Sequence, residues 1–96
     1  MVTAMFHAVV LIKARPNSLP TLGPTLAALD GVTEAYSVTG EWDFVAIVRL
    51  RRHEELAERV AGELALLPGI ERTETMVAFE VFSKHDLEAM FSIGAE

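Results

Sequence analysis

The stretch VTGEWDF at positions 38–44 holds a glycine, two acids and the only tryptophan of the chain. β-branched residues begin it and an apolar run follows it, so the pattern predicts a turn between two strands. Gly40 suits such a turn because glycine reaches positive φ at little cost. A turn requires neither Trp42 nor Asp43, and the presence of both indicates a further role for this segment.

The residues that most often carry catalysis or bind metals form no recognisable motif. His7, His53 and His85 have neither the H-E-x-x-H spacing nor a shared helical face, which argues against a histidine metal site. The chain has no cysteine, so a thiolate metal site and a disulfide are excluded. It also lacks a G-x-S-x-G motif and a phosphate-binding glycine loop. We therefore expect no cofactor, no metal and no enzymatic activity.

Three further residues, on two expected strands, each allow two interpretations. His7 lies on an expected strand among apolar neighbours, and we interpret it as a histidine of a subunit interface in preference to a catalytic base. Thr73 and Thr75 alternate with Glu74 on another expected strand. Ordinary β-propensity explains these threonines, and a polar binding role explains them equally well.

Length and composition indicate one domain that spans residues 1–96. Half of the residues (51%) are hydrophobic, which is high for a chain of 96 residues and indicates that another subunit covers part of the surface. The net charge of −6 argues against direct nucleic-acid binding. No apolar stretch approaches the ~20 residues that span a bilayer. We expect a cytoplasmic protein without membrane contact.

The chain repeats itself at a shift of 38 residues without a gap. Phe6 aligns with Phe44, and LAALDGV aligns with LALLPGI. Each half contains a strand, a helix that ends at a glycine, and a second strand. The expected strands are Met5 to Ala14, Val32 to Thr39, Asp43 to Leu50, and Ile70 to Phe82. This order predicts an α+β fold, the ferredoxin-like βαββαβ sandwich with one four-stranded antiparallel sheet and both helices on one face.

The expected strands are apolar on both faces. Val9 and Leu11 lie on one face of the first strand, and Val10 and Ile12 lie on the other. A strand with one solvated face normally alternates apolar and polar residues. We therefore predict a homodimer that packs sheet on sheet. After the repeat, Ser83-Lys84-His85-Asp86 resembles a capping box and predicts a short C-terminal helix, with an apolar stripe formed by Leu87, Met90 and Phe91.

YSVTGEWDFVAIVR, followed by a helix and PGIERTETMVAF, resembles the effector-binding (RAM) domain of the Lrp/AsnC, or feast/famine, transcriptional regulators. The family pattern is a T-G-x-x-D turn and then G-V/I-x-x-T-x-T before the last strand. The matching residues are Thr39, Gly40, Asp43, Gly69, Ile70, Thr73 and Thr75. The resemblance covers essentially the whole chain and implies the same ferredoxin-like fold.

This resemblance implies dimers that assemble further, and effectors such as amino acids bound between dimers near the turn. The expected ligand-binding residues are Thr39, Gly40, Glu41, Trp42, Asp43, Thr73 and Thr75. Backbone N–H groups at Gly40 would donate hydrogen bonds to a ligand carboxylate, and Asp43 would accept one from a ligand ammonium group. The threonine hydroxyls would add further hydrogen bonds. Trp42 would line the pocket or anchor a neighbouring dimer. The alternative is that Asp43 ties the turn to its own backbone and Trp42 packs locally.

The expected function is non-enzymatic sensing of an amino acid or related metabolite by a homo-oligomer. It would modulate transcription or amino-acid metabolism through protein partners, including full-length family members. No helix-turn-helix pattern precedes the first expected strand, so we expect a stand-alone effector domain. The alternative is a dimeric α+β barrel enzyme, a small monooxygenase or isomerase with His7 as its base. A cleft that contains His7 would favour the enzyme.

Overall fold

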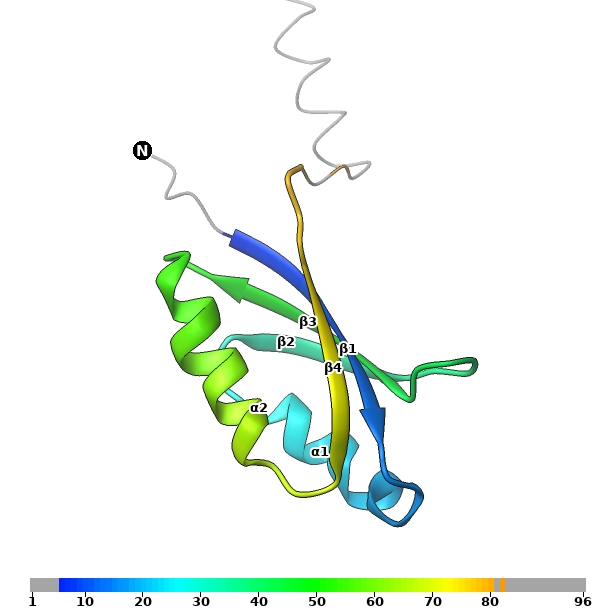
Figure 1. Ribbon diagram of the computed structural model, residues 1–96. Helices are drawn as coiled ribbons and strands as arrows, with labels where there is room; N and C mark the ends of the chain where they lie inside the picture. Colours follow the sequence, from blue (N-terminus) through cyan, green and yellow to red (C-terminus); the bar gives the residue numbers. More distant parts are fainter. Residues whose placement is uncertain (1–5, 81, 83–96) are drawn as a thin grey trace, which may run out of the picture.

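A computed structural model describes residues 6–80 and 82, which form a four-stranded sheet with helical segments against one face (Figure 1). The elements follow the order β1, η1, α1, β2, β3, η2, α2 and β4. Their bounds are Phe6–Ala14, Pro16–Ser18, Leu19–Ala27, Val32–Ser37, Phe44–Leu50, Leu56–Ala61, Gly62–Leu66 and Ile70–Val77. The βαββαβ order predicted from the internal repeat is confirmed.

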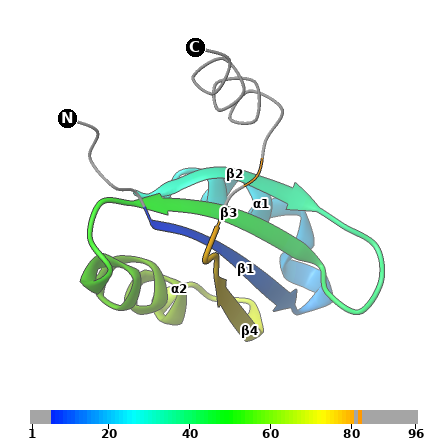
Figure 2. The same cartoon turned by 90° about the horizontal axis from the view of Figure 1, so that it is seen from above.

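The strands lie in the spatial order β2-β3-β1-β4, and every pair is antiparallel (Figure 2). The first strand of each half therefore lies in the centre of the sheet, and the second strand lies at an edge. Val9 of β1 pairs with Ile47 of β3 on one side and with Met76 of β4 on the other. Paired residues point to the same face, so this register fixes which side chains share a face.

The core lies between the central strands and the helices. Every second residue of the two central strands is buried, from Ala8 to Ala14 in β1 and from Phe44 to Leu50 in β3. Leu22 and Leu26 of α1 complete this core, together with Val60 of η2 and Leu64 of α2. The leucine and valine spacing predicted for the second helix therefore marks its buried side, since Leu56 and Leu67 also pack against the core.

Proline and glycine shape the helical segments. Pro20 occupies the first turn of α1 and Pro24 lies inside it, so α1 is only 9 residues long, in line with the shortening expected from Gly23-Pro24. Gly31 and Gly69 follow the two helical segments with φ of 90° and 91°, the left-handed conformation predicted for both. The second helical segment differs from a regular α-helix, because its residues Leu56–Ala61 form a π-helix before α2 begins.

Two strands are shorter than predicted. β2 ends at Ser37 and not at Thr39, because the chain then enters the turn, which the Val38 N–H closes on the Asp43 carbonyl at 3.0 Å. β4 ends at Val77, which pairs with Ala8, and not at Phe82; after it the Ala78 N–H donates one further bond to the His7 carbonyl. The expected C-terminal helix lies outside the described residues.

The sheet face opposite the helices, here called the open face, has an apolar centre. Val9 and Leu11 of β1 lie beside Ile47 and Val45 of β3, and all four are half-buried. Met76 of β4 and Tyr36 of β2 extend this stripe to the two edges and are 46% and 47% exposed. The prediction that the sheet is apolar on both faces is confirmed.

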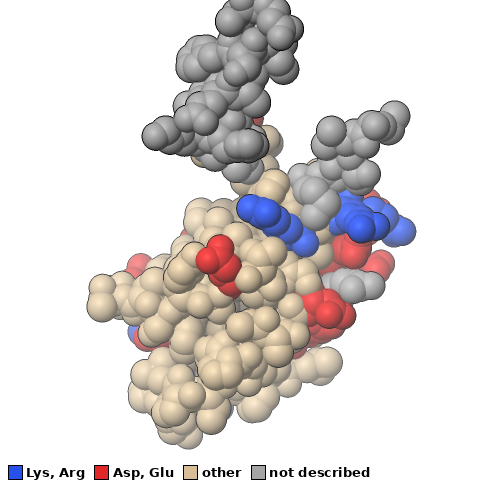
Figure 3. Space-filling view, turned by 180° about the vertical axis from the view of Figure 1, so that it is seen from behind, with Lys and Arg blue, Asp and Glu red and all other residues tan. Residues whose placement is uncertain are grey.

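Charge is distributed unevenly over the rest of the surface. Seen from behind, the lower part of the molecule is a broad surface without charged side chains, and Lys, Arg, Asp and Glu gather in the upper part (Figure 3). The uncharged part contains α1, whose sequence LPTLGPTLA has no ionisable residue. No helix in the described part of the chain is long and apolar enough to cross a membrane.

Candidate functional site

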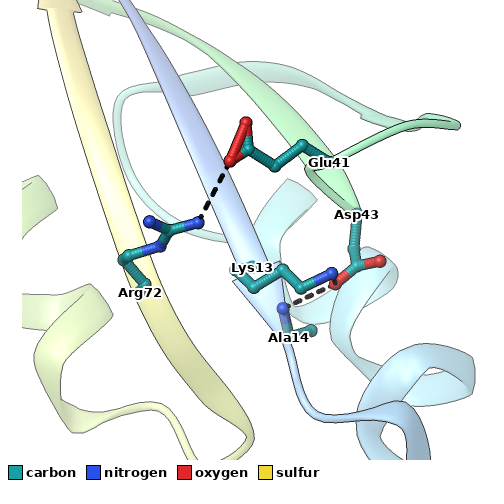
Figure 4. Close-up of polar contacts among 5 residues, drawn as sticks. All are labelled: Lys13, Ala14, Glu41, Asp43 and Arg72. Atoms are coloured by element: carbon teal, nitrogen blue, oxygen red, sulfur yellow. Dashed lines mark hydrogen bonds and ion pairs between the residues drawn. The ribbon is translucent and has the colours of Figure 1, made fainter.

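Asp43 joins the turn to strand β1 (Figure 4). Its carboxylate accepts a hydrogen bond from the Ala14 N–H at 2.8 Å and lies 3.7 Å from the Lys13 ammonium. Its own N–H donates to the Ile12 carbonyl at 2.9 Å. The β1–β3 ladder ends where Ile12 faces Phe44, so the Asp43 carboxylate extends that ladder by one side-chain bond. Asp43 therefore holds two distant segments together, and its bond is not made to the backbone of its own turn.

Arg72 of β4 reaches the same turn across the open face. Its guanidinium carbon lies 4.6 Å from the centroid of the Trp42 ring. Its Nη2 lies 3.5 Å from a carboxylate oxygen of Glu41 (Figure 4). The side chains of Arg72 and Glu41 are 58% and 70% exposed, so solvent weakens their ion pair. Trp42 is half-buried and packs within its own subunit through Arg72.

The tip of the turn is open to solvent. Gly40 has φ of 106°, and a Cβ added there would meet no atom within 4 Å. The glycine is therefore required by its backbone conformation and not by crowding. Thr39 and Glu41 beside it are exposed.

Thr73 and Thr75 line a pocket of about 250 Å³ between β4 and the second helical segment. Ala61, Leu64, Ala65 and Leu67 form its apolar wall. Ile70, Glu71 and Arg72 complete the lining from the start of β4. Drug-sized ligands occupy pockets of roughly 300 Å³ and more, so this pocket suits a smaller metabolite.

The predicted ligand-binding residues thus fall into two groups. Thr73 pairs with Ile12, a core residue, and so points toward the helices, whereas Arg72 pairs with Lys13 on the open face. Residues 39–43 do not line the pocket. Arg72 alone belongs to both groups, because it lines the pocket and contacts the turn.

Of the nine residues that line this pocket, sequence reasoning predicted only Thr73 and Thr75 as binding residues; the seven it missed include Ala61, Ala65, Glu71 and Arg72. A signal existed for the alanines, since two small residues four positions apart lie on one side of a helix. Glu71 and Arg72 directly precede the threonines in the segment ERTET. Glu71 and Arg72 lie at a β-bulge, and no sequence pattern predicts that bulge. Lys13 faces Arg72 and Ala14 faces Ile70, so Glu71 is the extra residue.

His7 lies apart from the pocket. It pairs with Arg49 on the open face, and it is not among the residues that line the pocket. His53 makes an edge-to-face contact with Phe6 at a centroid distance of 5.5 Å. Among the described residues, no group of three or more His, Asp or Glu side chains is placed to hold a metal ion.

The margin of the open face carries one perturbed ionisable group. The Tyr36 hydroxyl donates a hydrogen bond to Glu34 at 2.6 Å. This bond raises the pKa of Tyr36 above its usual value, and partial desolvation and the Glu34 charge act in the same direction. Both residues belong to β2, at the far edge of the sheet from the pocket.

The sequence model of the Lrp/AsnC ligand-binding domain matches residues 7–87. The chain belongs to the Lrp/AsnC ligand-binding domain family. The resemblance inferred from the T-G-x-x-D turn and the T-x-T strand is therefore confirmed. The match includes both the turn and the pocket-lining strand.

Proteins similar to this chain include HTH-type transcriptional regulators of Pyrococcus species. The uncharacterized HTH-type transcriptional regulator PH1692 of Pyrococcus horikoshii is 34% identical over 74 residues, which cover 77% of this chain and 49% of that protein. PF0250 of Pyrococcus furiosus, a regulator of the same description, is 37% identical over 75 residues, or 75% of this chain and 50% of that protein. The chain thus spans about half the length of these relatives.

Solved structures with the Lrp/AsnC fold agree with the architecture described above. TTHA0845 from Thermus thermophilus is 46% identical, with a TM-score of 0.76 over 82% of this chain and 99% of that one. AsnC from E. coli shares the fold with a TM-score of 0.73 at 23% identity, and the match covers 82% of this chain and 55% of AsnC.

Proposed function

We propose that this Lrp/AsnC domain is a non-enzymatic sensor that binds an amino acid or a related metabolite in the pocket between β4 and the second helical segment. The observation that carries the proposal is the 250 Å³ pocket lined by Thr73 and Thr75. The threonine hydroxyls can donate to and accept from a polar ligand, and the alanine and leucine wall can hold a short aliphatic group.

The proposed site differs from the one expected at the sequence level. Residues 39–43 do not line the pocket. The turn is connected to it by Arg72, which lines the pocket and contacts Trp42 and Glu41. The enzyme alternative is not favoured, because its candidate base His7 is not among the lining residues.

Assembly of the sensor would use the open face. Val9, Leu11, Val45 and Ile47 form a contiguous apolar centre there, and covering such a surface is favourable at ~25 cal/mol per Å². We propose that two copies pack these faces together and that the dimers assemble further through the exposed turn. Mixed assembly with full-length regulators of the family would carry the signal to transcription.

Isothermal titration calorimetry against the twenty standard amino acids tests the sensing role. We expect at least one of them to bind with a dissociation constant below about 1 mM, which corresponds to about −4 kcal/mol. Light scattering and circular dichroism on the same sample establish that the protein is folded and oligomeric. A folded oligomer that binds none of the twenty at this level would contradict the proposed function.

A further inference from the structure

Two phenylalanines that follow β4 have almost no cover from their own subunit. Phe79 is 104% exposed and Phe82 is 76% exposed. Both belong to residues 78–82, here called the arm, which leaves the end of the sheet and continues away from it (Figure 1). Apart from the bond between the Ala78 N–H and the His7 carbonyl, no hydrogen bond or ion pair joins the arm to the rest of the described chain. Aromatic rings exposed in this way indicate a contact that the isolated subunit does not make.

The apolar surface of the arm is continuous with the open face. The run MVAFEVF has the composition of a strand up to Phe82, whereas pairing with β1 stops with Val77 and one bond from Ala78. Exposed apolar side chains follow one another along this edge, from Met76 and Val77 to Phe79 and Phe82. Met76 itself belongs to the open face. The second copy that covers the open face is therefore the nearest candidate to cover the arm.

Charge also favours a second copy as the partner of the arm. The end of the open face from which the arm departs carries Arg49, which is exposed beside His7. Within the described part of the chain, no acidic side chain pairs with its guanidinium. Glu80 of the arm is exposed as well and has no cationic partner among the described residues. These two groups are complementary.

Two-fold packing of the open faces brings the complementary groups together. Packed sheets commonly keep their strands within roughly 30° of each other. With the two-fold axis along the strands, β4 of one copy lies over β2 of the other, and the same ends of both sheets meet. The arm of one copy then passes the end of the second copy that carries Arg49. At the opposite end, cations already have acidic neighbours, since Lys13 lies 3.7 Å from Asp43.

We propose that the arm of each copy packs Phe79 and Phe82 on the second copy of the dimer and pairs Glu80 with Arg49 of that copy. This inference rests on the face-to-face dimer of the proposed function. Burial of the two rings adds to the apolar contact of the open faces. The ion pair determines which end of the second sheet the arm meets.

Sedimentation equilibrium on single variants tests the aromatic contact. We expect Phe79→Ala and Phe82→Ala each to raise the dimer dissociation constant by about tenfold or more, because each removes a large side chain buried only in the dimer. Leu66→Ala is the matched control. Leu66 is 83% exposed but lies on α2, away from the open face, so its variant should dimerise like the wild type. Circular dichroism should show the wild-type fold in all three variants.

A charge exchange tests whether the arm reaches the second copy. Arg49→Glu and Glu80→Arg should each weaken self-association by about threefold or more, because like charges then meet twice in each dimer. In an equal mixture, these two variants should form heterodimers in preference to homodimers, since both contacts then join opposite charges. A pair within one chain would give no such preference. Native mass spectrometry with one isotope-labelled variant measures the proportions.

The control for the exchange is a mixture of Arg15→Glu and Glu58→Arg. These variants carry the same charge changes at exposed positions away from the arm, and they should mix at random. If the wild type is a monomer, the proposed dimer and this inference both fail. If it is a dimer, and either the phenylalanine variants dimerise equally well or Arg49→Glu and Glu80→Arg mix at random, the face-to-face dimer stands and the exchange of arms is overturned.

Discussion

Asp43 belongs to the turn and Arg72 contacts it, and the two side chains differ in their surroundings. The Asp43 side chain is 22% exposed and satisfies a backbone donor that strand pairing leaves free. Arg72 is 58% exposed and makes two contacts that solvent weakens. Leaving a buried donor without an acceptor costs more than losing an exposed ion pair. Asp43 therefore contributes more to the stability of the fold than the exposed contacts of Arg72 do.

Replacement of Asp43 should show this structural role. We expect Asp43→Ala to lower the free energy of unfolding by about 1–3 kcal/mol, because the part-buried Ala14 N–H loses its acceptor. Asp43→Asn keeps an acceptor oxygen and should lose less. Urea denaturation followed by circular dichroism measures both. The matched control is Glu41→Ala in the same turn, which removes only an exposed ion pair and should stay within about 1 kcal/mol of the wild type. Equal losses for Asp43→Ala and Glu41→Ala would refute the distinction.

At the scale of the elements, the sequence predicts the order of strands and helices because both halves repeat one hydrophobic pattern. It also predicts the two helix-ending glycines, since their left-handed conformation is a local property. The strand ends and the bulge at Glu71 depend on how neighbouring strands pair, which is a property of the folded sheet. Within one subunit, strand alternation puts the threonines on the helix side of β4 and Arg72 on the open face. The site expected near the turn would lie between subunits, and it stays a prediction.

The second helical segment should control the size of the pocket. Ala65 lines it and Ala57 does not, although both are exposed alanines of the same segment. We expect Ala65→Leu to fill part of the 250 Å³ and to weaken amino-acid binding by about tenfold or more, while Ala57→Leu leaves binding unchanged. Calorimetry measures the affinities, and thermal melts establish that both variants fold. Equal affinity in the two variants would place the ligand elsewhere.

For the whole molecule, the open face is the feature that the isolated chain leaves unexplained. Its apolar centre runs across all four strands from Met76 through Val9 and Ile47 toward Tyr36 and β2. The net charge of −6 does not hide this surface, since none of the apolar side chains of the stripe is ionised. A second copy of the same face would bury the stripe symmetrically.

A charge at the centre of this stripe should disrupt the proposed dimer. We expect Ile47→Asp to dissociate or unfold the protein, because an unpaired carboxylate would be buried between the sheets at a cost of several kcal/mol. The control Ala28→Asp puts the same charge on the exposed end of α1, away from the open face, and should leave the dimer intact. Multi-angle light scattering gives the masses. A wild type that runs as a stable monomer would contradict the use of this face.

The turn should affect only the higher assembly. Trp42→Ala removes the ring against which Arg72 packs and leaves the sheet face unchanged. We expect it to shift the oligomer toward a folded dimer with little loss of secondary structure. The same light-scattering measurement, at several protein concentrations, distinguishes this from Ile47→Asp. Dissociation of Trp42→Ala to monomers would show that the turn stabilises the dimer itself.

In the proposed sensor, the pocket between β4 and the second helical segment holds the ligand. Backbone amide shifts, recorded by NMR during titration with the amino acid that binds most tightly in calorimetry, test it most directly. We predict that the largest changes occur at Ala61, Ala65, Glu71, Thr73 and Thr75. Amides of the open face around His7 should respond little. Changes confined to the open face, with none at the threonines, would contradict the account.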